Sequence, residues 1–343
     1  MDAHDAFEPC DDWADPWEGE HGDDLCERPP VRPRVLLERA RSVVTSNASP
    51  DIPFDHAVNP YRGCAHACIY CYARPTHEYL ELDADAEFES VLFVKSNAPE
   101  VLAKELTAPR LAGRVVCFSG VTDPYQPLEA SFGITRRLLE VCAVRRQPVL
   151  VFTKGALVRR DADVLARIAR TSGAMVYLSI PFADPEVARA LEPAAPSPSA
   201  RFRAMRALAD AGVPVGLSLA PLVPGLNDRD VARLVECAAE SGATRAFTTF
   251  LRLPGPVEEI FARRLAERLP DAAKRVESAL RDAGAHRAGR AAFGERMVGS
   301  GPRWELAVDL FRKAARRCGI EANDAPEPVL PRVTKEQQGE LFG

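Results

Sequence analysis

The sequence lacks the features that would mark a membrane or exported protein. It has no run of about 18 apolar residues, so no transmembrane helix is expected. The start, Met1-Asp-Ala-His-Asp, has neither a basic segment nor an apolar one, so a signal peptide is not expected either. With 46% hydrophobic and 27% charged residues, the composition indicates a globular protein, which we place in the cytoplasm.

Paired cysteines are also missing. The chain has nine cysteines, an odd number, and without an export signal they are not expected to form disulfides. No second Cys/His pair at ligand spacing accompanies the one cysteine-rich loop, so a zinc site would have His66 as its fourth ligand. The further Cys-Pro of bacterial ferredoxins is absent. A single loop therefore has to carry any inorganic centre.

Basic residues are nearly absent from the start of the chain. Residues 1–28 contain eleven acidic side chains and the single Arg28, a net charge of −10, whereas the whole chain has −5. The remainder is therefore about +5 by difference. Such an acidic segment with few apolar residues is typical of disorder, and a proline-rich stretch follows it. We expect a disordered acidic tail and linker over residues 1–34.

The loop itself has three cysteines in a Cys-x3-Cys-x2-Cys spacing: Cys64, Cys68 and Cys71. Cysteine thiolate is the usual ligand of an iron–sulfur cluster, and a [4Fe–4S] cluster has four irons to ligate. Three protein ligands leave one iron open to a substrate or cofactor. The spacing therefore predicts a [4Fe–4S] cluster rather than zinc.

Beyond the linker, short apolar segments alternate with helical patterns, which is typical of parallel β/α units. We expect a partial (β/α)6 TIM-like barrel within residues 35–283, then a C-terminal extension with a helix at 303–317 within 284–318, and a tail over 319–343. The six expected strands are 56–59, 115–119, 149–153, 175–180, 213–219 and 245–251.

Polar residues recur where these strands end. Thr122 and Asp123 follow the second strand, Lys154 follows the third, and Ser179 lies at the end of the fourth. Because chemistry in such barrels lies at the carboxyl ends of the strands, we expect these residues and the cysteine loop to share one site. Tyr125 and Gln126 would meet substrate there or form a rigid turn between two prolines.

These motifs resemble those of the radical S-adenosylmethionine (radical SAM) superfamily, and in particular spore photoproduct lyase and its uncharacterised bacterial relatives. The resemblance runs from about residue 53 to 226. It rests on the cysteine loop with its aromatic residue before Cys71, Val121-Thr-Asp123, Phe152-Thr-Lys154, Leu178-Ser-Ile180, Leu191-Glu-Pro193, Arg201 and Ala211-Gly-x-Pro-x-Gly216. It implies a radical SAM barrel and an enzyme that cleaves SAM reductively to a 5′-deoxyadenosyl radical, which abstracts hydrogen from substrate. It also implies an external electron donor such as flavodoxin or ferredoxin.

Residue roles follow from the same resemblance. Cys64, Cys68 and Cys71 would bind the cluster, Tyr70 would lie against adenine, and Tyr70 and Tyr72 match tyrosines of the lyase's hydrogen relay. The Thr122 region, including Asp123, would meet the SAM amino group, and Lys154 its carboxylate. Ser179 would bind the ribose or carboxylate, while Glu192 and Arg201 would either contact SAM or form a supporting pair.

One position departs from the lyases. They have a cysteine hydrogen donor three residues before the residue that Asp123 matches, where this chain has Gly120. Cys117 is three residues further upstream, on the strand. The resemblance therefore implies the radical generator without the lyase's finishing chemistry.

The substrate and partners are less defined by the sequence. A basic segment over 284–304, with Phe293 and Trp304 beside His286, Arg287, Arg290, Arg296 and Arg303, suits a nucleic acid as well as a solvated loop. Gln338-Gly-Glu-Leu341-Phe342 resembles short peptides that dock on the DNA sliding clamp. DNA is thus a candidate partner. The alternative function is a non-catalytic iron–sulfur or zinc protein that binds partners through its tails.

Overall fold

The main sheet has eight strands in the order β12-β11-β10-β9-β8-β7-β4-β3. This is a computed structural model, and it describes residues 7–16, 32–49, 51, 54–283 and 297–322. The strands are β3 (Val44–Ser46), β4 (His56–Val58), β7 (Val116–Phe118), β8 (Val149–Thr153), β9 (Ala174–Ser179), β10 (Val215–Leu222), β11 (Arg245–Phe250) and β12 (Glu321–Ala322).

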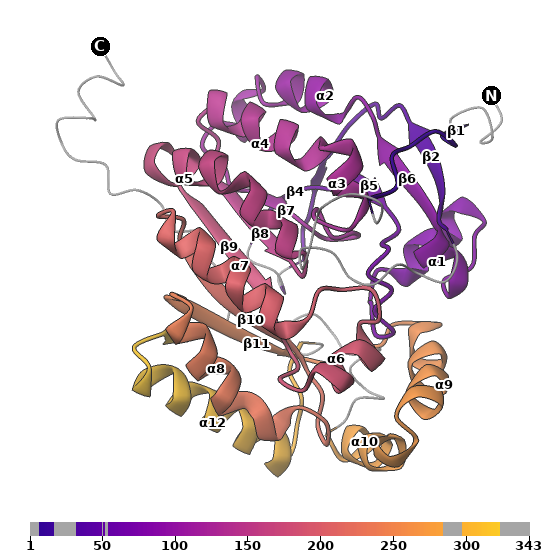
Figure 1. The fold of residues 1–343 in the computed structure, drawn as a ribbon, viewed down its shortest axis with the longest axis vertical. Helices are drawn as coiled ribbons and strands as arrows, with labels where there is room; N and C mark the ends of the chain where they lie inside the picture. The colour runs from indigo at the N-terminus through magenta and orange to yellow at the C-terminus, as the bar shows by residue number, and fades with distance from the viewer. Residues whose placement is uncertain (1–6, 17–31, 50, 52–53, 284–296, 323–343) are drawn as a thin grey trace.

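Six of these strands are the ones that the sequence predicts. From β4 to β11 each strand pairs in parallel with the next along the sheet, and β3 adds an antiparallel edge to β4. Helices connect them and cover the outer face of the sheet (Figure 1): α2 (Ala98–Glu105), α3 (Leu128–Phe132), α4 (Ile134–Val144), α5 (Ala162–Thr171), α6 (Pro185–Leu191), α7 (Pro198–Asp210) and α8 (Val231–Glu240). The predicted partial (β/α)6 barrel is confirmed.

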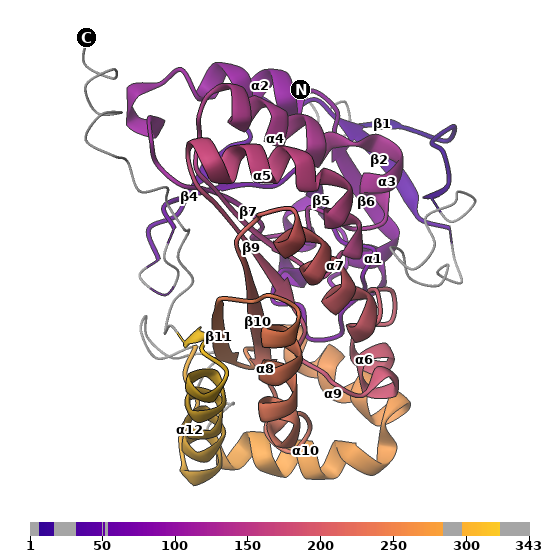
Figure 2. The same cartoon turned by 60° about the vertical axis from the view of Figure 1, so that its left-hand side comes forward.

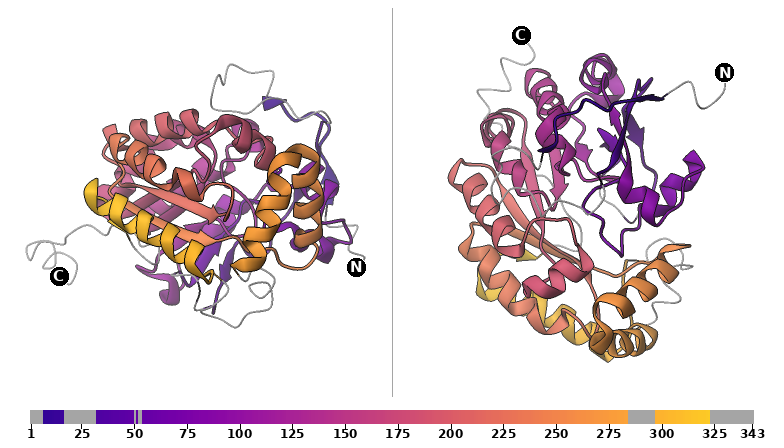
Figure 3. Two further views of the ribbon diagram at one scale, coloured as in Figure 1. Left: turned by 90° about the horizontal axis from the view of Figure 1, so that it is seen from below. Right: turned by 45° about the vertical axis from the view of Figure 1, so that its right-hand side comes forward.

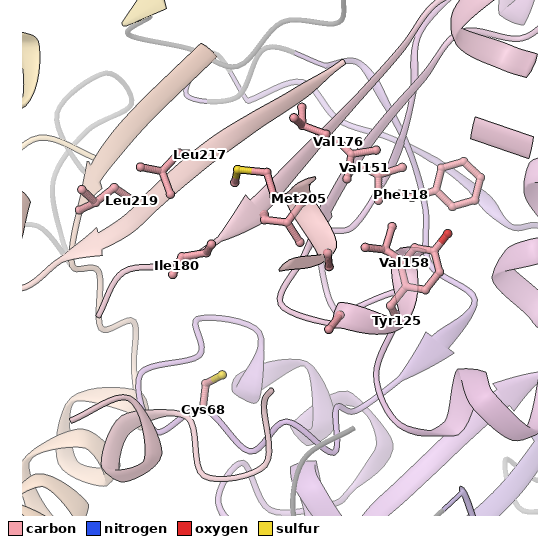
Figure 4. Packing of buried hydrophobic residues seen from close by; sticks show 14 of the residues in the cluster. Cys68, Phe118, Tyr125, Val151, Val158, Val176, Ile180, Met205, Leu217 and Leu219 are labelled. Atoms are coloured by element: carbon pink, nitrogen blue, oxygen red, sulfur yellow. The ribbon is translucent and has the colours of Figure 1, made fainter. Parts of the chain in front are cut away.

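Side chains that point alternately to the two faces of the main sheet form two separate apolar clusters. On the outer face, Val151, Val176 and Leu217 pack with Met205 of α7 in one large apolar cluster (Figure 4). On the inner face, Leu150 and Tyr177 belong to a second, smaller cluster. Because alternate residues of a strand point to opposite faces, a strand buried on both sides is mostly apolar, as β8 and β9 are up to their last residues, Thr153 and Ser179.

A second sheet has the strand order β1-β2-β6-β5 and was not predicted. Its strands are β1 (Phe7–Pro9), β2 (Arg34–Glu38), β5 (Tyr61–Arg62) and β6 (Val91–Lys95), with α1 (Ala86–Ser90) before β6. Strand β5 leads directly into the cysteine loop, so this sheet supports the loop from outside the barrel. The pairing joins segments far apart in sequence, which local patterns do not reveal.

The prediction of a disordered tail over residues 1–34 is wrong for the described parts of that range. Residues Phe7 to Pro9 pair antiparallel with β2. Trp13 is buried, stacks against Phe132 at 6.4 Å between ring centroids, and has the guanidinium of Arg32 over its ring. Burial of the Trp13 ring and pairing with β2 together help to offset the cost of ordering this acidic segment.

The C-terminal helices close the lower end of the molecule. Helices α9 (Val257–Arg268) and α10 (Pro270–Asp282) lie on one side, and α12 (Pro302–Arg317) lies on the other (Figures 1 and 3). Helix α12 packs on α8, and the following β12 pairs in parallel with β11 (Figure 2). The predicted helix at 303–317 is confirmed. The predicted clamp-binding residues Gln338, Leu341 and Phe342 lie outside the described residues, and the domain boundaries stay a prediction.

Candidate active site

The three cysteines lie on the loop between β5 and a short 3-10 helix, Arg74–Leu80. Cys64 and Cys68 are buried and Cys71 is half-buried, and all three line one cavity. Gly63 turns the chain into the loop with φ at +72°, where a Cβ would lie 2.8 Å from the carbonyl oxygen of Phe88. The position before Cys64 therefore requires glycine.

Burial determines the ionisation of the deeper thiols. It raises the pKa of Cys68 to about 12, although the nearby Lys154 opposes the rise. It raises the pKa of Cys64 well above its usual value, and Asp123 adds to that rise. Binding of a cluster requires thiolates, so it would release these protons and depend on pH.

This thiol arrangement fits a cluster better than a single metal ion. Across the described residues, no three His, Cys, Asp or Glu side chains are placed to hold one ion. The zinc alternative, with His66 as fourth ligand, therefore gains no support. A cluster makes a different demand, since each thiolate binds its own iron. His66 instead lies with Nδ1 3.4 Å from Oδ2 of Asp123.

A fully buried arginine holds the loop from below. Arg74 donates from Nε to the carbonyl oxygen of Cys68 at 3.0 Å and from Nη2 to that of Ala67 at 3.3 Å. Its charge is balanced by Glu89, with 2.6 Å between Nη2 and Oε2. Glu89 in turn pairs with Arg264 of α9 at 3.0 Å, so the loop and α9 are joined through one carboxylate. Nothing in the sequence distinguishes this arginine from an exposed one.

Lys154 and Ser179 lie at strand ends as predicted, and both line the cavity with the cysteines. Lys154 continues the inward-facing row of β8 that begins at Leu150. Burial alone would lower the pKa of Lys154, but Cys68 and Glu192 raise it overall, so the ammonium keeps its charge. Ser179 donates to the carbonyl oxygen of Ala220 at 3.2 Å.

Glu192 and Arg201 form a buried ion pair, with 2.5 Å between Nη2 and Oε2. Arg201 also donates to the carbonyl oxygens of Ser179 at 2.8 Å and Pro196 at 2.7 Å. The Nζ of Lys154 lies 3.8 Å from Oε1 of Glu192. Of the two predicted alternatives for this pair, the contacts favour support of Lys154 and Ser179.

Tyr70 belongs to the same network. Its hydroxyl donates to Glu192, and the ammonium of Lys154 lies 5.6 Å from its ring centroid. Burial, with Glu192 nearby, raises the pKa of Tyr70 well above its usual value, so the phenol stays protonated. Tyr72 differs, because it is 52% exposed and lines the cavity.

Asp123 is held by three hydrogen-bond donors. Its carboxylate accepts from the backbone N–H groups of Lys154 at 2.7 Å and Tyr125 at 2.8 Å, from the hydroxyl of Thr153 at 2.5 Å, and faces His66. Burial alone would raise the pKa of Asp123, but His66 and these hydrogen bonds lower it to about 2. Asp123 thus joins the ends of β7 and β8 beneath the cavity.

Of the two predicted alternatives for Tyr125 and Gln126, the structure favours the rigid turn. Both are buried: the phenol of Tyr125 donates to Asp161 at 3.1 Å, and Gln126 bonds the cysteine loop. Of the basic segment, Arg303 pairs with Asp228 at 2.5 Å, and Trp304 is largely buried but lines the cavity. The rest of that segment, with His286, Arg287, Arg290, Phe293 and Arg296, lies outside the described residues.

Among the described residues, the three cysteines of the loop are the only cysteines that line the cavity. Gly120 lines the cavity. Cys117 is fully buried in the inner apolar cluster beside Leu150 and Met175 and is not among the cavity-lining residues of the described chain. Burial raises the pKa of Cys117 well above its usual value. Cys117 therefore packs as an ordinary core residue.

The cavity itself has a volume of about 730 Å³. The cysteine loop and the ends of β7, β8 and β9 form one wall. Other parts of the wall come from β11 and α12, including Thr248, Trp304, Asp309 and Arg312. Of these, sequence analysis named only Trp304, as a candidate for base stacking; Asp309 and Arg312 of the same helix are placed at the cavity by tertiary packing.

Comparisons with known proteins agree with this geometry. The model of the radical SAM superfamily matches residues 58–238. An uncharacterised protein of Mycobacterium tuberculosis is 34% identical over 249 residues, which cover 72% of this chain and 73% of that protein. An uncharacterised protein of Methanocaldococcus jannaschii is 29% identical over 195 residues, 57% of this chain and 68% of that protein.

Solved structures share the fold. A spore photoproduct lyase variant with bound AdoMet and dinucleoside spore photoproduct has a TM-score of 0.61 and 17% identity, covering 84% of this chain and 80% of that one. A second lyase structure, with the same dinucleoside, has a TM-score of 0.60. None of the helices in the described parts of the chain is long and apolar enough to cross a membrane. The chain belongs to the radical SAM superfamily, whose members use a [4Fe–4S] cluster and SAM.

Proposed function

We propose that this protein is an enzyme that abstracts hydrogen from a nucleic acid base or lesion bound in the cavity. The observation that carries the radical step is that three cysteines from one loop line the same cavity as Lys154 and Ser179. A scaffold that merely held a cluster would have no need of a half-buried cation and a hydroxyl beside it. When bound, the cluster and SAM supply a 5′-deoxyadenosyl radical, and the protein supplies position and shelter.

The residues take the following roles. Cys64, Cys68 and Cys71 ligate the cluster. Lys154 binds the SAM carboxylate as a compact cation, and the Glu192–Arg201 pair keeps Lys154 and Ser179 in place.

The Thr122 segment, Tyr70 and Tyr72 take the remaining roles. The Thr122 segment offers backbone groups to the SAM amino group, because the Thr122 hydroxyl already donates to the carbonyl of Gly63 at 2.6 Å. Tyr70 presents its ring to the adenine, since its hydroxyl is bound to Glu192. Tyr72, exposed in the cavity, is the hydrogen-transfer residue that faces substrate.

The substrate class rests on the aromatic lining. Phe54, Phe152 and Phe247 contribute to the cavity wall, with Phe152 and Phe247 edge to face at 5.9 Å between centroids. Such faces suit stacking of a planar base. The lyase of the same fold binds a dinucleoside, which supports this class by analogy. A cytosolic setting and an external electron donor such as flavodoxin or ferredoxin belong to the same proposal.

Removal of one ligand tests the assignment. We expect Cys71→Ala to abolish both the cluster and SAM cleavage, because two thiolates do not hold a cube whose fourth iron must stay open. Cys237→Ala, a half-buried cysteine on α8, is the control and should retain both. The readouts are iron per chain and 5′-deoxyadenosine. Cleavage retained by Cys71→Ala would contradict the proposal.

A further inference from the structure

Gln126 is fully buried, and its side-chain amide bonds the cysteine loop and Thr122. Its Oε1 accepts from the backbone N–H of Ala65 at 2.9 Å. Its Nε2 donates to the carbonyl oxygen of Gly63 at 3.2 Å and to the hydroxyl of Thr122 at 3.0 Å. The residues bonded in the loop, Gly63 and Ala65, flank Cys64 on either side.

The amide therefore brackets one cluster ligand. Only a group that both donates and accepts can bond the carbonyl before Cys64 and the N–H after it, and the glutamine amide does so. The Thr122 hydroxyl donates to the same Gly63 carbonyl, which then has two donors. We call these contacts of Gln126 and Thr122 the Cys64 bracket.

The anchor of the bracket is itself rigid. The backbone N–H of Gln126 donates to the carbonyl of Asp123 at 3.3 Å, and its carbonyl accepts from Glu129 at 2.9 Å. Glu129 is fully buried and pairs with Arg160 at 2.6 Å. Gln126 thus links the loop after β7 to the backbone on either side of Cys64 and fixes their relative position.

We propose that Gln126 is the positioning residue for Cys64, holding the backbone so that the thiolate keeps its place at the cluster. This inference rests on the proposed function. Gln126 itself is not expected to contact substrate or SAM. A residue that orients a ligand in this way affects how firmly the metal is held, typically by roughly 10- to 100-fold.

A matched pair of variants tests the proposal. Gln126→Met keeps the size of the side chain and removes every hydrogen bond of the bracket amide. Gln147→Met is the control, because Gln147 is also buried and donates to backbone, to the carbonyls of Leu111 at 2.9 Å and of Arg114, away from the cysteine loop. Both variants and the wild type are reconstituted anaerobically with iron and sulfide.

Three quantities are measured: iron lost per minute to excess chelator, the spin-resonance spectrum of the reduced cluster, and the midpoint of thermal unfolding. We expect Gln126→Met to lose iron roughly 10- to 100-fold faster than Gln147→Met and to change the spectrum. The two variants should lower the unfolding midpoint similarly. Equal iron retention and an unchanged spectrum would overturn the proposal.

A second variant keeps the test decisive if Gln126→Met does not fold. Thr122→Val removes one donor of the bracket without changing the volume, and should lose iron faster than the wild type by a smaller factor. Retention equal to the wild type would overturn the proposal in that case. A wild type that takes up no iron would overturn the proposed function, and the inference with it.

Discussion

At the scale of residues, Lys154 is the charged group that we propose to bind SAM. Its ammonium lies in the cavity wall, 3.8 Å from Glu192, which also pairs with Arg201. Because Glu192 pairs closely with Arg201, it lies farther from the Lys154 ammonium, which stays charged. A compact ammonium can bind the carboxylate of SAM as a point charge.

We expect Lys154→Met to raise the dissociation constant for SAM by roughly 10-fold or more, since a hydrogen bond to a charged group contributes about 1.5–3 kcal/mol. Iron per chain should not change. The measurement is SAM binding by equilibrium dialysis of the reconstituted protein. Lys95→Met, a buried lysine of the small sheet, is the control. SAM affinity unchanged within two-fold would remove Lys154 from the site.

The lowered pKa of Asp123 can be tested through the pH dependence of the protein's stability. Because its pKa in the folded protein is lowered to about 2, from 3.8, it stabilises the fold above pH 4, and that contribution is lost as the pH falls toward 2. The contribution is about 2 kcal/mol at neutral pH. In urea unfolding, Asp123→Asn should therefore be less stable than the wild type at pH 6, and the difference should shrink between pH 4 and pH 3. A difference independent of pH would contradict the lowered pKa.

At the scale of elements, the parallel strands were predictable and the anchoring of the cysteine loop was not. Strands such as β8 and β9 are short apolar runs between glycine or polar residues, so each strand can be recognised from its own residues. The loop is held by Arg74 from one side and by Gln126 from another. Polar side chains of this kind look the same in sequence whether they are buried or exposed.

Arg74 shows how much the loop depends on one such side chain. We expect Arg74→Met to lower the free energy of unfolding by about 3 kcal/mol, because it leaves Glu89 short of a partner and several loop carbonyls without a donor. Arg263→Met is the control: Arg263 pairs with Asp85 in the same network but is half exposed, so its loss should cost less than about 1 kcal/mol. Equal losses in urea titrations would show that burial of Arg74 is unimportant.

At the scale of the whole molecule, the cavity is lined by two parts of the chain: one lies within the matched superfamily span, and the other lies beyond it. The wall with the cysteines, Lys154 and Ser179 lies inside the matched superfamily span of 58–238. The wall from β11 and α12 lies outside it, and apart from Trp304 its residues could be placed at the cavity only by tertiary packing. Local motifs thus predicted the cysteine side of the cavity, whereas most of the α12 side could not be predicted from sequence.

The most direct test of the account is the cleavage of SAM by the reconstituted protein. The protein is loaded anaerobically with iron and sulfide and reduced with dithionite in the presence of SAM. The readouts are iron content, the spin-resonance spectrum and 5′-deoxyadenosine by chromatography. We expect about four irons per chain and 5′-deoxyadenosine as product. Zinc in place of iron, or a cluster that leaves SAM intact, would contradict the proposed function.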